Sequence, residues 1–137
     1  MYNTQLTNLA VNTEADAFAP LLNNGWIDCY GGFQPANGEL AVSTQQLLVQ
    51  FRFAATAFGA AVNGVLTANA IAAAMTLAAG DLVWFRAYKA DHVTAVYDGS
   101  IGIIEANMVV SSVRVYASAQ VQVATFTHTI AKSTMGS

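Results

Sequence analysis

The stretch "LLVQFRF", Leu47 to Phe53, carries the clearest strand pattern in the chain. Every second residue from Leu47 to Phe53 is a large apolar side chain, and Gln50 and Arg52 lie between them. Successive side chains of a strand point to opposite faces of the sheet. This period of two therefore predicts a strand that rests one face on a core.

Further along the chain, "DLVWFRAYKADHVTAVYDGS", Asp81 to Ser100, reads as a β-hairpin. Its two β-rich runs, Leu82 to Tyr88 and Val93 to Asp98, are joined by the short polar loop from Lys89 to His92. Asp98-Gly99 is a turn-forming pair, so a turn is expected directly after the second run. This hairpin makes antiparallel pairing the expected organisation.

Towards the N-terminus, "WIDCY", Trp26 to Tyr30, predicts another strand, closed by the turn formers of "GGFQPANG". Before it, apolar residues at helical spacing predict one short helix with Thr13 as N-cap. Pro20 is expected to kink this helix or confine it to the preceding residues, because proline removes one helical hydrogen bond.

The alanine-rich segment from Ala54 to Gly80 permits two interpretations. Asn69 as N-cap and Gly80 as C-cap would suit a helix. Asn63-Gly64 between apolar stretches would suit a hairpin turn, and this interpretation is favoured, with Val65 to Ile71 extended.

The last third of the chain has strand character with an irregular face. "SSVRVYAS" alternates regularly, but "QVQVATFTHTI" places Val121 and Val123 on one parity and Phe126 and Ile130 on the other. Either a β-bulge near Ala124 or coverage of both faces by a neighbouring chain would resolve this conflict. Coverage by a neighbour is the expected solution.

Together these patterns predict one domain, residues 1–137, with an all-β, jelly-roll-like β-sandwich fold and one short N-terminal helix. A chain of this length can bury one sizeable core. The expected core includes Phe51, Phe53, Val113, Val115 and Val121.

Charged residues are unusually scarce. They make up 9% of the chain, whereas hydrophobic residues make up 55%, and an ordinary soluble domain has about 25% charged residues. A free monomer of this kind would leave much apolar or neutral surface in water. We therefore expect other protein to cover much of the surface.

The same composition disfavours several classes of function. The net charge is −3 and the five cations are scattered singly, so nucleic-acid binding is not expected. The longest apolar run, Ala70 to Ala79, is half the ~20 residues that a membrane-spanning helix needs, and the N-terminus does not resemble a signal peptide. Cys29 is the only cysteine, which leaves no intrachain disulfide.

Catalytic and metal-binding interpretations have little support from the spacing of residues. The sharpest one takes Cys29 as nucleophile, His92 or His128 as base, and Asp91 or Asp28 as the orienting group. No paired spacing such as H-x-x-x-H supports a metal site. We therefore predict no enzyme activity, no cofactor and no metal. A glycan-binding alternative would use four strand aromatics, Trp26, Tyr30, Trp84 and Tyr88.

The succession "ADAFAPLLNNGWIDCYGG", "QQLLVQFRFAATAFGAAVNGV", "WFRAYKADHVTAVYDGSIG" and "VATFTHT" resembles a group of small proteins encoded among the structural genes of tailed bacteriophages and prophages. The resemblance runs from about Ala15 to Thr129 and rests on the order of these blocks. It implies a virion structural protein without catalytic residues, made in the host cytoplasm. Pro20 departs from the pattern, because similar sequences have an uninterrupted helix there.

Among virion roles, a small neutral β-sandwich best suits a capsid decoration or cement protein on the capsid surface. Its expected partners are copies of itself, most simply in a trimer, and the major capsid protein. Trp84, Phe126 and Ile130 are the predicted interface residues. A head-tail connector, neck or tail protein is the alternative, and a lectin-like module is the third.

Overall fold

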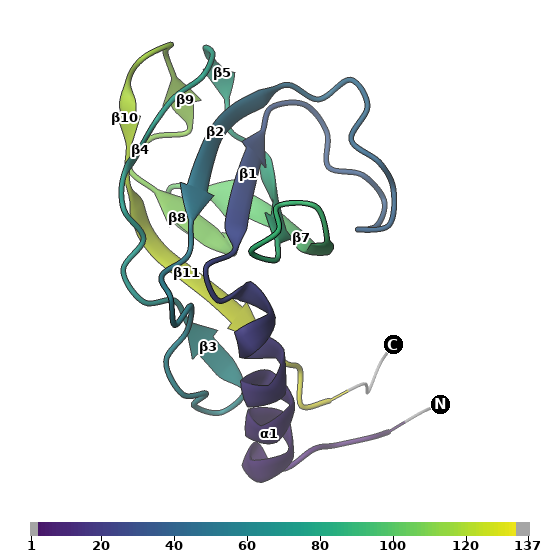
Figure 1. Ribbon diagram of the computed structural model, residues 1–137. Helices are drawn as coiled ribbons and strands as arrows, with labels where there is room; N and C mark the ends of the chain where they lie inside the picture. The colour runs from purple at the N-terminus through teal and green to yellow at the C-terminus, as the bar shows by residue number, and fades with distance from the viewer. Residues whose placement is uncertain (1–2, 134–137) are drawn as a thin grey trace.

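The computed structural model describes residues 3–133 (Figure 1). Helix α1 (Asn8–Phe18) leads into a short 3-10 turn, η1 (Ala19–Leu22), and strands follow from there on. The strands are β1 (Trp26–Tyr30), β2 (Leu47–Arg52), β3 (Val65–Thr67), β4 (Ala74–Met75), β5 (Gly80–Asp81), β6 (Trp84–Tyr88), β7 (Ala95–Gly102), β8 (Met108–Val110), β9 (Arg114–Val115), β10 (Gln120–Val121) and β11 (Val123–Thr129). No helix in the described part is long and apolar enough to cross a membrane.

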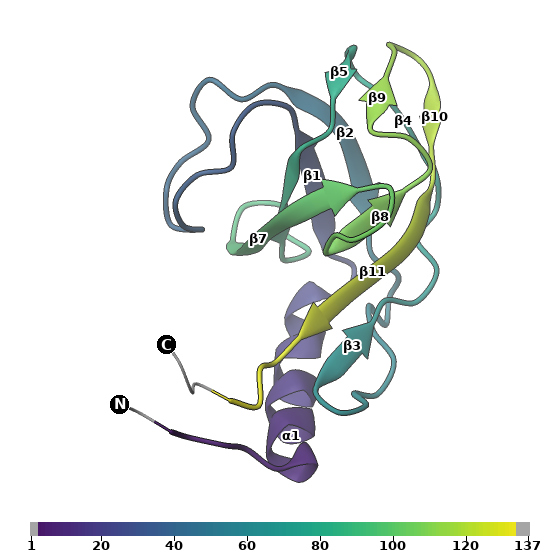
Figure 2. The same ribbon diagram turned by 180° about the vertical axis from the view of Figure 1, so that it is seen from behind.

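Seven strands form one curled sheet in the order β2-β1-β6-β7-β8-β11-β3. Its neighbouring strands pair antiparallel, except that β7 and β8 run parallel. Figures 1 and 2 show β1 and β2 on one side of the molecule and β8 and β11 on the other, with the core between these two layers. The structure confirms the expected all-β, sandwich-like fold with one short N-terminal helix.

The helix begins earlier than its sequence pattern predicts. Thr7, not Thr13, is the N-cap, and its hydroxyl oxygen accepts a hydrogen bond from the backbone N–H of Ala10 at 3.2 Å. The Thr13 hydroxyl donates to the carbonyl of Leu9 at 2.8 Å, from inside the helix. The α-helix ends at Phe18, and Pro20 lies in the 3-10 turn, as expected for a residue without a backbone N–H.

The alanine-rich segment is extended, as the Asn63-Gly64 pair predicts. Both residues have positive φ, 52° and 79°, and Val62 pairs with Val65 across the turn. Such φ values are the signature of a two-residue hairpin turn, for which Asn-Gly is the preferred sequence. The helical alternative that starts at Asn69 is wrong, because Ala74–Met75 is a strand paired with β10.

The predicted turn at Asp98-Gly99 is wrong. Both residues lie in the middle of β7, where Asp98 is opposite Arg86 and Gly99 is opposite Phe85. A Cβ on Gly99 would overlap the ring of Phe85, so glycine serves here to make room for an aromatic side chain. The hairpin itself is confirmed, with β6 and β7 joined by the loop 89–94.

A β-bulge resolves the irregular parity of the C-terminal strand. Val123 pairs with Val110 and Thr125 pairs with Val109, so Ala124 is the extra residue. The bulge turns Phe126 into the core of the same chain, where it is 1% exposed. The expected coverage by a neighbouring chain is therefore not needed to explain this strand.

The core fills the space between the two layers. Phe51, Phe53, Val115 and Val121 are buried as predicted, and Val113 is partly buried against them. Phe126 meets the rings of Phe53 and Phe85 at centroid distances of 5.1 Å each. These ring contacts place an aromatic cluster within the buried apolar core.

Candidate functional site

The outer face of β2, β1, β6 and β7 carries a row of polar side chains. The strand register places Gln50, Asp28, Arg86 and Asp98 side by side, one from each strand. Asp28 and Arg86 are only 6% and 4% exposed. Because buried charges need partners, the side chains of this row are expected to pair with one another and with nearby polar groups.

Arg86 and Asp98 form a two-pronged ion pair. Nε and Nη2 of Arg86 donate to the two carboxylate oxygens of Asp98 at 2.7 and 2.9 Å. Both side chains are 5% exposed. The hydrogen bond to Asp98 raises the pKa of Arg86, so the guanidinium is a permanent positive charge.

Asp28, the neighbour of Arg86 in this row, is held by the side chains of His92 and Gln50. His92 Nε2 lies 2.8 and 3.0 Å from the two carboxylate oxygens, and Gln50 Nε2 donates to Oδ1 at 3.1 Å. His92 comes from the loop 89–94 and has a positive φ of 60°. Its ring stacks on Trp26 at 4.4 Å, and the Arg52 guanidinium lies 4.4 Å from the centroid of the same indole.

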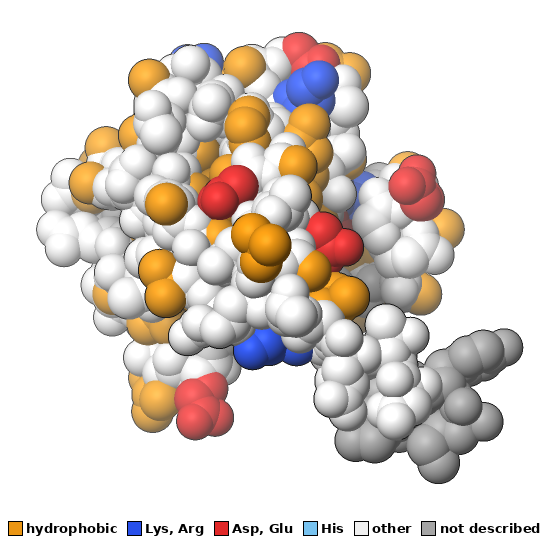
Figure 3. Space-filling model, turned by 90° about the horizontal axis from the view of Figure 1, so that it is seen from below, with side chains coloured by type: hydrophobic (Ala, Val, Ile, Leu, Met, Phe, Trp, Pro, Cys, Tyr) orange, Lys and Arg blue, Asp and Glu red, His pale blue; other side chains and the backbone are white. Residues whose placement is uncertain are grey.

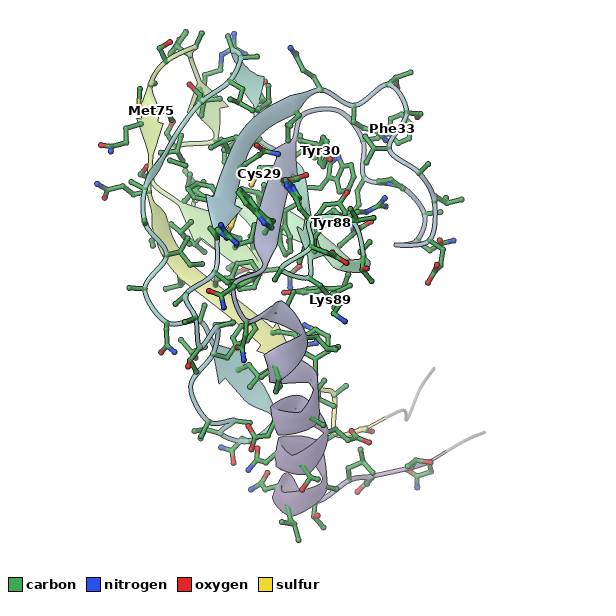
Figure 4. The ribbon with its side chains drawn as sticks, viewed as in Figure 1. Cys29, Tyr30, Phe33, Met75, Tyr88 and Lys89 are labelled. Carbon is green, nitrogen blue, oxygen red and sulfur yellow. The ribbon has the colours of Figure 1, made fainter. Side chains whose placement is uncertain are left out.

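Three aromatic side chains flank the Arg86 end of the row. Tyr30 stacks on Trp84 at 4.6 Å, and Trp84 is fully buried beneath it. Burial raises the pKa of Tyr30. Figure 4 shows Tyr30 and Tyr88 on the side of β1 that faces the long loop carrying Phe33.

A groove of about 550 Å³ opens above these tyrosines. Tyr30, Arg86 and Tyr88 line its floor, and the walls are formed by residues 38–42 of the long loop and by residues 93–95. This volume lies within the range of ligand sites, which is roughly 300 to 1,000 Å³. The groove is therefore the main candidate site on this face.

The long loop, residues 31–46, is held in place by Gln45. The Gln45 side chain is 8% exposed, donates to the carbonyl of Phe33 at 2.9 Å and accepts from the backbone N–H of Ser43 at 2.9 Å. At the loop tip, Gly38 lies close to Tyr97 and Asp98 of β7. The loop thus bridges the sheet face and forms one wall of the groove.

The predicted catalytic residues do not come together. Cys29 is fully buried on the core side of β1, whereas Asp28 lies on the outer face, and burial raises the pKa of the Cys29 thiol. His128 stacks on Phe18 at 4.5 Å, and burial lowers its pKa. Only the pairing of His92 with Asp28 is present.

Asp91 has a local role in the hairpin loop. Its carboxylate accepts from the backbone N–H groups of Val93 and Thr94 and from the Thr94 hydroxyl. These hydrogen bonds, led by the Thr94 hydroxyl, lower the pKa of Asp91 to about 2. Across residues 3–133, no three His, Cys, Asp or Glu side chains gather closely enough to hold a metal ion.

The aromatic residues predicted for glycan stacking are mostly covered. Trp26 lies between His92 and Arg52, and Trp84 lies beneath Tyr30, so neither indole offers a free face. Tyr30 and Tyr88 do reach the groove. Arg86 and Asp98 were not among the predicted site residues. A lone arginine within the apolar run "DLVWFRAY" is nevertheless a sequence signal for a buried partner.

Two of the three predicted interface residues belong to the interior of the single chain. Trp84 is fully buried and Phe126 is 1% exposed, whereas Ile130 is partly buried. The large apolar side chains that do face solvent are Leu9, Leu21, Phe33, Leu40, Val62, Met75, Leu77, Val83, Val93, Ile103, Ile104 and Tyr116.

Comparisons with protein-family models, with curated proteins and with solved structures found no match for this chain.

Proposed function

We propose that this chain is a bacteriophage virion structural protein, and that it acts as a capsid decoration or cement protein. The observation that carries the proposal is the surface, where large apolar side chains are exposed and charges are few. Figure 3 shows apolar side chains scattered over one face with only isolated charged groups between them. A protein held by many neighbours in a shell can keep such a surface.

The apolar groups of the β4 end suit an interface best. Met75 and Leu77 are 54% and 59% exposed, and Tyr116 is 65% exposed. Thr76 ties this end together, because its hydroxyl donates to the Tyr116 carbonyl and accepts from the Ala119 N–H. In Figure 4, Met75 lies far from the groove tyrosines, so contacts here would leave the groove open.

In this proposal the partners are further copies of the chain, most simply in a trimer, and the major capsid protein. The location is the capsid surface, after synthesis in the host cytoplasm. A shell protein is repeated around local symmetry axes, so its contacts bury more than about 1,000 Å² at each specific interface. Isolated surface charges contribute little to such contacts.

The deciding experiment counts copies of the protein in purified virions. A decoration protein is expected in hundreds of copies spread over the shell, and imaging should place it between capsomers. The alternative, a head-tail connector or neck protein, would form one closed ring of about six or twelve copies. Absence of the protein from purified virions would refute both roles.

A paired substitution tests the proposed surface. Met75→Glu with Leu77→Glu should abolish attachment to capsids, while Leu9→Glu with Val62→Glu, at the opposite end near α1, serves as the matched control. Both changes lie on exposed side chains, so the circular dichroism spectrum should be unchanged. Normal attachment of the first variant would remove this end from the interface.

A further inference from the structure

The proposed virion role does not involve the groove over Tyr30, Arg86 and Tyr88. Contacts with neighbouring residues hold two of the side chains that line its floor. Tyr30 rests on the buried Trp84 ring, and Asp98 holds Arg86 by two hydrogen bonds. Groups fixed in this way lose little freedom when a ligand binds.

Arg86 keeps hydrogen-bonding capacity beyond its pair with Asp98. Nε and Nη2 donate to Asp98, while Nη1 has no hydrogen-bond partner within residues 3–133. The side chain lines the groove although it is only 4% exposed. An arginine has five N–H donors, so those that remain can reach a ligand from a fixed position.

The two phenol groups add a mixed donor and acceptor site. The Tyr30 and Tyr88 side chains both line the groove, and each phenol hydroxyl can donate and accept a hydrogen bond. Glu39, at the wall of the groove, offers acceptor oxygens only. A ligand group that both donates and accepts, such as a hydroxyl, satisfies this combination.

The charges around the groove argue against a strongly charged ligand. Arg86 is neutralised by Asp98, so an anion would not find an uncompensated cation and would also face Glu39. A cation would have to approach the buried guanidinium of Arg86. The groove therefore favours a neutral polar ligand.

The rim supplies apolar contact. Leu40 and Val93 line the groove from opposite walls and are 46% and 79% exposed. The C–H faces of a sugar ring pack against such side chains and against aromatic edges, while its hydroxyls meet the polar floor. A neutral sugar ring thus matches both the apolar rim and the polar floor of the groove.

We infer that this groove binds a neutral carbohydrate, with Arg86, Tyr30 and Tyr88 bonding its hydroxyls. This binding site is separate from the Met75 end that the capsid role uses. A particle whose shell carries the protein would then display many copies of a weak sugar-binding site. When several such sites bind one surface at the same time, the overall avidity exceeds the affinity of a single site without any new contact.

A glycan array that contains neutral, sialylated and sulfated oligosaccharides tests the inference with the full-length protein. Calorimetry on the strongest neutral oligosaccharide then compares variants. Tyr88→Phe should weaken binding by roughly 5- to 10-fold, because one hydroxyl hydrogen bond is lost. Ala41→Trp, which places an indole in the groove wall, should abolish binding.

Tyr116→Phe and Ala117→Trp make the same chemical changes outside the groove and should leave the affinity unchanged. The inference is overturned by three results: no carbohydrate binding on the array, preference for the charged oligosaccharides, or equal effects of the groove and control variants. It is also overturned if Ala41→Trp dissociates an oligomer, because the groove would then be a contact between copies. None of these results bears on the copy number in virions, so the capsid role is tested independently.

Discussion

The imidazole of His92 stacks on the indole of Trp26 with ring centroids 4.4 Å apart and an angle of 6° between the planes. The same imidazole bonds to Asp28 through Nε2. His92 therefore attaches the loop 89–94 to β1 by two contacts of different kinds. The loop residues Val93 and Thr94 form a wall of the groove, so this attachment also shapes the candidate site.

Asp28→Asn should lower the free energy of unfolding by about 1–3 kcal/mol. Asp28 is 6% exposed and receives hydrogen bonds from His92 and Gln50, and an amide cannot replace both bonds to a charged acceptor. Urea unfolding measures the change. Asp81→Asn is the control, because its ion pair with Arg114 is exposed and should contribute less than about 1 kcal/mol. Equal losses would contradict a special role for Asp28.

The buried pair of Arg86 and Asp98 should show strong coupling in a double-mutant cycle. Arg86→Met leaves the Asp98 charge unpaired, and Asp98→Leu leaves the Arg86 charge unpaired, so each should cost about 3–5 kcal/mol. Arg86→Met with Asp98→Leu removes both charges and should cost less than the sum of the two. Additive losses in denaturant unfolding would argue against the pairing.

Gly99→Ala should destabilise the protein by about 1–3 kcal/mol. The added methyl group would overlap the Phe85 ring and force the aromatic core to shift. Gly59→Ala makes the same chemical change where no atom lies within 4 Å of the new methyl, so it should be nearly neutral. Thermal unfolding of the two variants checks this, and a stable Gly99→Ala protein would contradict the pairing of Gly99 with Phe85.

His128 should make stability depend on pH in the mildly acidic range. Burial lowers the pKa of His128 in the folded chain, so the unfolded chain binds the proton more readily. Its effect is absent well above the unfolded pKa of about 6.5, and stability is lost as pH falls from there through the lower folded pKa.

His128→Gln removes this proton linkage without adding a charge. The unfolding free energy of the parent protein minus that of the variant should decrease as the pH is lowered from 8 to 5. A difference that stays constant would show that His128 does not titrate on unfolding. Measuring both proteins in the same buffers cancels the contributions of the carboxylates.

Local sequence patterns predict those strands and turns whose conformation is decided by neighbouring residues. The alternation from Leu47 to Phe53 predicts β2, and Asn63-Gly64 predicts the turn because few other pairs adopt two positive φ angles. The low charge likewise follows from composition alone. These features depend on residues close together in the chain.

The tertiary structure decided what depends on residues far apart. Asp98-Gly99 has the composition of a turn, yet Arg86 and Phe85 across the strand pair make it part of β7. Contacts between distant segments also decide the burial of two aromatic residues. Phe126 reaches the core through the bulge at Ala124, and Trp84 stacks with Tyr30. The groove itself requires the loop 31–46 to cross the sheet and meet the hairpin, and no local pattern encodes that meeting. Burial and ion pairing between distant segments outweigh local propensity, because a buried charge or a large void costs more than an unfavoured turn residue gains.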